Sequence, residues 1–318
     1  MNSTVDPLTT VYPTTYKIFW GYCCDIWFPV YLLIICLYAY VIYILCTSKS
    51  SKYKSAYFSI FICTGVADIV DAIAIEYIRL SQRIGMGPSF GWLLQITTAI
   101  TGSNFAMHLI GNSLMSTFQF SAVWLPIFHN SFWKVRNTRI IMAVMIVIPI
   151  IVYGHLLFTE FVFIQDNIGR WRYKNRIDPI TKTRILDSVL TVAQALISGS
   201  MSICTIVGIR LKTDGSFKKN LPEKSLVLVE LINVVFGSME TLYGFISLFN
   251  IPLTNSFLVF IFDEFVSYFF LMVTLNAFTL PLLSATMRAE IAHRIWGKSM
   301  SAVVTVVERS ASNAKAQK

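Results

Sequence analysis

Charged residues are scarce in this chain, at 14% of its 318 residues, whereas a typical soluble domain carries about 25%. Hydrophobic residues make up 55% of the chain, and the mean hydropathy is +0.62. This composition excludes an ordinary soluble domain and predicts an integral membrane protein.

Metal-ligating patterns are also lacking. The six cysteines form no CxxC pair and lie mostly inside apolar runs, so neither a metal site nor a disulfide framework is predicted. Only two of the four histidines, His108 and His155, fall within apolar runs, whereas a zinc hydrolase needs three or four convergent ligands. We therefore expect no bound metal.

Features of the known membrane enzymes and pigments are missing as well. The last apolar run contains no lysine, which excludes a retinal Schiff base there. Asp263 lies in the sequence FDEF rather than in the GxGD and YD contexts of intramembrane aspartyl proteases. The sequence therefore predicts a protein that is not an enzyme and that binds no cofactor.

The net charge of +9 is not gathered into a dense basic segment. Nucleic-acid binding usually needs a clustered basic patch, so no nucleic acid is expected as a partner. Membrane lipid is the expected surrounding instead.

Long apolar runs are what the sequence has in abundance. A membrane-spanning helix needs about 20 apolar residues, and seven runs approach that length: Ile26 to Thr47, Ala56 to Ile78, Gly91 to Leu125, Arg139 to Ile164, Leu186 to Arg210, Lys224 to Phe249 and Asn255 to Leu283. Short connections predict one antiparallel bundle. We expect an all-α membrane protein with an N-terminal segment at 1–25, a seven-helix domain at 26–283 and a tail at 284–318.

Lysine and arginine predict the orientation of the bundle. With the N-terminus outside the cell, the inner loops and tail hold seventeen of these residues and the outer segments hold nine, which agrees with the positive-inside rule. The six basic residues between Arg170 and Arg184 argue against it. Asn2 lies in a glycosylation sequon, Asn-Ser-Thr, which agrees with an outer N-terminus. The segment from Ser284 to Trp296 is expected to be an amphipathic helix on the inner membrane surface.

The run from Gly91 to Leu125 carries Asn104, His108 and Asn112 at four-residue spacing. This spacing places them on one face of a helix. Since a polar stripe is costly against lipid, we expect this helix to lie at the centre of the bundle.

No lysine or arginine lies deep in any run. Eight acidic residues within the apolar runs are candidates for a polar role: Asp68, Asp71, Glu76, Glu160, Glu230, Glu240, Asp263 and Glu264. Asp68 and Asp71 share roughly one face of the second run, where they can meet Asn112 and Asn276. This polar cluster has three interpretations: static hydrogen bonds between helices, a two-state switch that holds water or a sodium ion, or a proton relay.

A ligand pocket is expected in the outer half of the bundle, because a concave apolar site with a few convergent polar groups is the usual form of such sites. The alternative for each candidate is simple packing in the protein interior. The candidate residues are Asn104, His108, Asn112, His155, Glu240, Asp263 and Glu264.

Several stretches carry a likeness to a known family. They are WFPVYLLIICLYAYVIYIL in the first run, KYKSAYFSIFICTGVADIVDAI around the second, and FQFSAVWLPIFHNSFWK at the end of the third. With seven spans and a short amphipathic segment, the chain resembles the nematode serpentine chemoreceptors of G-protein-coupled receptor type, especially the class gamma group. The resemblance implies a multi-pass plasma-membrane receptor that detects a small external chemical and signals through a heterotrimeric G protein.

The resemblance places the G-protein contact at the inner ends of the helices. There are two departures from common receptors: Gln119 stands where many have an arginine, and the seventh run ends in Asn-Ala-Phe-Thr-Leu-Pro rather than NPxxY. The expected contact residues are Gln119, Pro126, Trp133, Lys134, Arg136, Lys218 and Lys219. The alternative function is a ligand-gated channel or transporter, for which the eight intramembrane acids would form the pathway.

Overall fold

The computed structural model describes residues 14–48, 51–165, 171–174, 178–211, 224–249, 251, 257–258 and 265–296. The seven long helices of this part are α1 (Thr14–Thr47), α2 (Ala56–Ile84), α3 (Gly91–Trp124), α5 (Val135–Tyr153), α6 (Asp178–Leu211), α7 (Lys224–Phe249) and α9 (Phe265–Leu283). Shorter pieces join or follow them: η2 (Ser51–Lys54), η3 (Pro88–Phe90), α4 (Pro126–Phe132), η4 (Gly154–Phe158), β1 (Val162–Gln165), β2 (Trp171–Lys174) and α10 (Ala285–Trp296).

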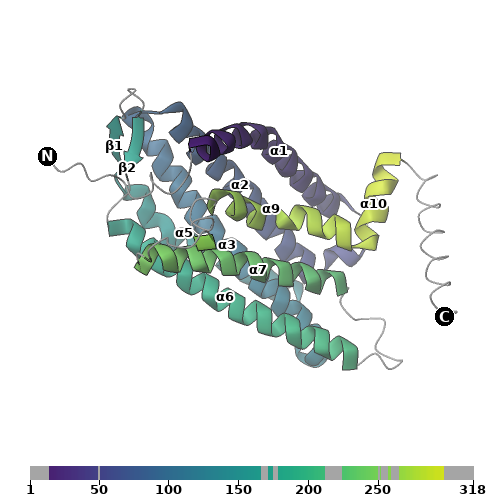
Figure 1. Ribbon diagram of the computed structural model, residues 1–318. Helices are drawn as coiled ribbons and strands as arrows, with labels where there is room; N and C mark the ends of the chain where they lie inside the picture. The colour runs from purple at the N-terminus through teal and green to yellow at the C-terminus, as the bar shows by residue number, and fades with distance from the viewer. Residues whose placement is uncertain are drawn as a thin grey trace.

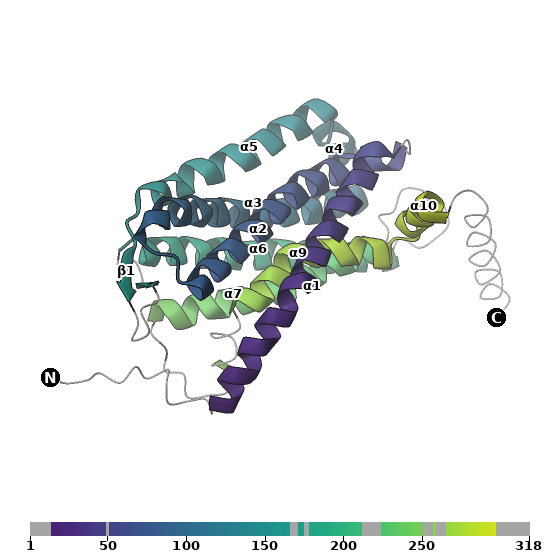
Figure 2. The same cartoon turned by 90° about the horizontal axis from the view of Figure 1, so that it is seen from above.

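The long helices alternate in direction along one bundle axis (Figures 1 and 2). The β1–β2 hairpin lies at one end of the bundle, and α4 and α10 lie at the other, while α1 crosses its neighbours obliquely (Figure 2). The segment Met287–Arg294 of α10 is turned by 81° from Phe269–Leu282 of α9. With the orientation predicted from the basic residues, the hairpin end is the outer end and the α4 and α10 end is the inner end.

Helix α3 occupies the centre of the bundle. It packs against α2, α5, α6 and α7, and every residue from Gly102 to Leu109 is buried. A helix buried on all sides can carry polar residues because none of its faces meets lipid. The central position expected for this helix is therefore confirmed.

Two glycines allow α3 to approach its neighbours closely. A Cβ atom at Gly102 would overlap the Tyr153 ring of α5, and one at Gly111 would overlap the Thr64 hydroxyl of α2. Both contacts depend on the absence of a side chain. A third glycine, Gly85, has φ of 74° and ends α2 with its N–H bonded to the Ser81 carbonyl at 3.1 Å, as is common at helix C-termini.

Four spans in the described part are long and apolar enough to cross a membrane: Pro29–Thr47, Ala56–Ile78, Val135–Phe158 and Ile185–Leu211. Counting the bent pair α9 and α10 as one span makes five. Helix α3 has the length but is rich in polar residues, which its neighbours cover. Helix α5 has the opposite character, since Ile140, Val144 and Ile151 are exposed as lipid-facing residues should be.

The predicted end of the fourth span is wrong. The fourth span was expected to continue to Ile164, but helical structure ends at Phe158, and Val162–Gln165 forms strand β1. This strand pairs antiparallel with β2, with Val162 opposite Lys174. The apolar run therefore contains both the end of a helix and a strand of the outer hairpin.

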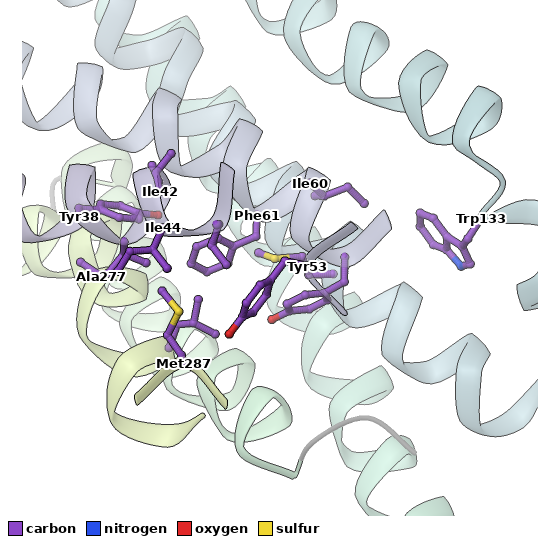
Figure 3. Packing of buried hydrophobic residues seen from close by; sticks show 14 residues of the cluster. Tyr38, Ile42, Ile44, Tyr53, Ile60, Phe61, Trp133, Ala277 and Met287 are labelled. Carbon is purple, nitrogen blue, oxygen red and sulfur yellow. The ribbon is translucent and has the colours of Figure 1, made fainter. Parts of the chain in front are cut away.

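The main hydrophobic core lies toward the inner end. Its fourteen buried residues come mainly from α1, α2, α9 and α10, and include Tyr38, Phe61, Ala277 and Met287. Figure 3 shows Trp133 at one edge of this cluster, next to the α4–α5 connection. The core thus holds the inner ends of these helices together directly below the central polar residues.

Candidate functional site

A hydrogen-bonded network crosses the centre of the bundle from α1 to α3. The Tyr38 hydroxyl donates to Asp68 Oδ2 at 2.7 Å. His108 Nδ1 lies 2.8 Å from Asp68 Oδ1, and His108 Nε2 lies 2.9 Å from Asn112 Nδ2. We call these four residues the central network. Its members are at most 1% exposed, so their hydrogen bonds form in a low-dielectric interior where each one matters.

The two ring nitrogens of His108 have different partners in the central network. With Asn112 Nδ2 donating to Nε2, the imidazole is neutral and its Nδ1–H donates to Asp68. Asn112 Oδ1 has no hydrogen-bond partner in the described structure. The central network therefore keeps one acceptor without a donor among the described residues.

The other two cluster candidates lie next to this network. Asn276 of α9 is buried beside the Tyr38 hydroxyl, and its Oδ1 accepts from Asn233 Nδ2 of α7 at 3.4 Å. Asp71 lies by Thr101 of α3, but neither carboxylate oxygen makes a hydrogen bond in the described structure. The structure thus brings together Asp68, Asn112 and Asn276, with Asp71 close by.

Sequence reasoning missed two members of this site and grouped a third differently. Tyr38 lies in an otherwise apolar span, where tyrosine is ordinary, and Asn233 gave no pattern of its own. His108 was grouped with the ligand pocket, whereas its bonds are to the cluster. Its four-residue spacing from Asn112 was the signal that could have linked them.

Only some of the pocket candidates lie in the interior of the bundle. Asn104 is buried one turn outward from His108, and its Nδ2 has no hydrogen-bond partner in the described part. Glu240 of α7 is 7% exposed and interacts electrostatically with Asp187 of α6. The Tyr153 hydroxyl donates to Asp187, an acid that falls inside the fifth apolar run but was not among the candidates.

The structure does not place the remaining pocket candidates, His155, Asp263 and Glu264, in the interior of the bundle. His155 is exposed in η4, and its Nδ1 lies 2.8 Å from the Val152 carbonyl oxygen. Asp263 and Glu264 lie outside the described residues. Asn104, His108, Asn112 and Glu240 are therefore the described candidates that face the interior.

The inner end contains a second polar group of residues. Ser121 Oγ accepts from Trp133 Nε1 at 2.9 Å and lies 2.9 Å from His129 Nδ1. Burial lowers the pKa of His129, and its hydrogen bond to the Phe118 backbone opposes that shift in part. These bonds fix α4 against the end of α3.

The expected G-protein contacts differ in exposure. Pro126, Lys134 and Arg136 are exposed, whereas Gln119 and Trp133 are buried. Neither amide atom of Gln119 has a hydrogen-bond partner in the described structure. Lys218, Lys219 and the sequon residue Asn2 lie outside the described residues. Within the described residues, no group of three or more His, Cys, Asp or Glu side chains could hold a metal ion.

A bundle of long apolar helices with a buried polar centre and a compact inner end defines a multi-pass α-helical membrane protein of the seven-helix type. Residues 22–296 match the family model described as serpentine type 7TM GPCR chemoreceptor Srv. The chain belongs to this family of chemoreceptors. No curated protein matches it.

The family match confirms the serpentine chemoreceptor resemblance and the all-α membrane fold. Its class, Srv, differs from the gamma class within the same nematode superfamily. Because the family consists of receptors and not enzymes, the expectation of a non-enzymatic protein is also confirmed.

Proposed function

We propose that this chemoreceptor detects a small external chemical at the plasma membrane and signals through a heterotrimeric G protein. The observation that carries the proposal is the central network, in which the buried Asp68 bonds to both Tyr38 and His108. A network that joins three helices through one carboxylate changes its bonds when those helices move. Membership of the chemoreceptor family supports this use of the network.

The ligand site is proposed to lie on the outer side of the central network. Asn104 and Glu240 are buried and keep hydrogen-bonding atoms without a partner in the described residues. Burying such groups is costly unless something bonds to them, and a ligand with polar groups would do so. Asp263 and Glu264 remain candidates on the sequence alone.

Signalling is proposed to follow a shift between two arrangements of the helices. A ligand can shift this equilibrium only by its difference in affinity for the two arrangements, at about 1.4 kcal/mol for each tenfold change in their ratio. His108 is well placed to sense the ligand, since it lies one turn inward from Asn104 and bonds to Asp68 of the neighbouring helix.

The G protein is proposed to bind the exposed residues of the inner end, Pro126, Lys134 and Arg136, together with Lys218 and Lys219. Trp133 and Gln119 are buried, so we assign them a positioning role. The Trp133 bond to Ser121 holds α4 against α3.

The test is expression of the chain in cells that carry a G-protein reporter and an electrophysiological readout, followed by pooled odorants. We expect a reporter response that disappears when the G protein is removed. A ligand-gated current that persists without G proteins would contradict the proposal and favour the channel. A tag at Asn2 that is found inside the cell would contradict the placement of the pocket.

A further inference from the structure

A cleft of about 380 Å³ opens at the inner end of the bundle. The start of α2, the end of α3, α4 and the start of α5 enclose it. The polar side chains that matter for its chemistry are Lys54, Ser59, His129, Asn130, Thr138 and Arg139. The central network and the proposed ligand pocket do not contribute to it.

The cleft is positively charged. Lys54 and Arg139 both line it and both are exposed, and neither forms an ion pair with any described residue. The cleft lining contains no aspartate or glutamate. Two cations without an acidic neighbour leave a positive potential that an anion would neutralise.

Two helix N-termini add to this potential. Helix α2 begins at Ala56 after Ser55, and α5 begins at Val135 after Lys134; neither end has a side-chain cap. Ser55, Ala56 and Val135 line the cleft. The unbonded N–H groups and the positive ends of two helix dipoles therefore meet at the same place as the two cations, an arrangement that favours phosphate groups.

The remaining lining of the cleft is apolar. Phe118, Trp133 and Met142 line its inner wall, and helix α5 continues from the cleft with exposed Ile140 and Val144. A polar, cationic opening beside a lipid-facing apolar helix matches a molecule that has an anionic head and apolar chains. A soluble anion would use only the first of these features.

We propose that this cleft binds the phosphorylated headgroup of an anionic phospholipid from the inner leaflet, with Lys54 and Arg139 as its cationic ligands. The acyl chains lie along the exposed face of α5. Basic pockets between spanning helices on the inner side are suited to such headgroups. The bound lipid would brace α4, and with it the inner end that we assign to the G protein.

The test uses the full-length receptor, purified in a neutral detergent and titrated with short-chain phosphatidylinositol phosphate, short-chain phosphatidylcholine or inorganic phosphate. Binding is measured by the shift in melting temperature and by calorimetry. We expect the phosphoinositide to bind more tightly than either other probe. The double variant Lys54→Gln, Arg139→Gln should weaken it about thirtyfold, from about 1 kcal/mol for each basic residue near the headgroup.

The matched control is Lys134→Gln, Arg136→Gln, which removes the same charge from exposed residues of the same end that do not line the cleft. It should retain phosphoinositide binding. A second variant, Ser59→Phe, narrows the cleft while keeping both cations, and should also lose binding. Equal losses in the two double variants would indicate diffuse surface attraction and overturn the proposal, as would phosphate binding as tight as that of the lipid.

Discussion

Replacing Asp68 by asparagine would leave the shape of the central network nearly unchanged but remove its only carboxylate. The two bonds at stake are those from the Tyr38 hydroxyl at 2.7 Å and from His108 Nδ1 at 2.8 Å. The new amide has one oxygen to accept a bond and an NH₂ that would face the other donor. At least one bond to a charged acceptor is therefore lost.

The expected magnitude follows from the burial of these groups. A hydrogen bond to a charged group contributes about 1.5 to 3 kcal/mol, and Asp68 and His108 are each 1% exposed, so water does not replace it. If the bonds form in only one of the two helix arrangements, a change of about 2 kcal/mol alters their ratio about thirtyfold. We expect Asp68→Asn to change basal reporter activity to that extent.

The assay compares basal and evoked reporter signals at equal surface expression, together with the melting temperature of the purified protein. Tyr38→Phe should shift basal activity in the same direction, since it removes one of the two bonds to Asp68, also at about 1.5 to 3 kcal/mol. Tyr40→Phe is the matched control on the same helix. A lower melting temperature with unchanged basal and evoked signals would refute the switch and leave Asp68 as static helix packing.

Three further predictions concern other parts of the molecule. Gly111→Ala should lower the melting temperature and the surface level, because a Cβ there would overlap an α2 side chain. Overpacking of this kind reduces the free energy of unfolding by about 1 to 3 kcal/mol. Gly154→Ala is the control, since a Cβ at that position has open space and should be tolerated. Glu240→Gln should reduce ligand potency in the reporter assay, and the exposed His155→Gln should not; equal losses would contradict the pocket. Burial lowers the pKa of His129 in the folded protein, whereas in the unfolded chain the pKa of histidine is about 6.5. Neutral His129 therefore contributes fully to the free energy of unfolding above that pH. This contribution falls as the pH drops from about 6.5 toward the folded pKa. A His129→Gln variant should lack that component of the melting-temperature decrease on acidification; an identical decrease would contradict it.

The helices of the membrane domain were largely predictable from the sequence. Because polar groups are costly to expose to lipid, membrane-spanning helices consist of long apolar runs. Helix α7 has the predicted limits, Lys224 and Phe249. The polar face of α3 was also predictable, since Asn104, His108 and Asn112 could not face lipid. The residues that meet that face were not predictable, because the partner Tyr38 comes from a helix whose sequence has no distinguishing pattern.

The errors at the outer end have physical causes. An apolar, β-branched stretch such as Val162–Gln165 is compatible with a helix or a strand, and its pairing with Trp171–Lys174 depends on a partner beyond the predicted span. His155 lies in a 3₁₀ segment, where about three residues per turn instead of 3.6 change the direction of the side chain. The predicted fourth span included this residue in one continuous helix, whereas the structure exposes its side chain.

The two close glycine contacts of α3 limit how this receptor can change shape. Gly102 meets α5 and Gly111 meets α2 with no room for a methyl group, and these positions lie on either side of His108. Rotating α3 by one residue, about 100°, would bring larger side chains against both neighbours. Rotation of α3 against α2 and α5 is therefore hindered, and we expect a ligand-driven change to shift or tilt helices along these contacts rather than to turn α3.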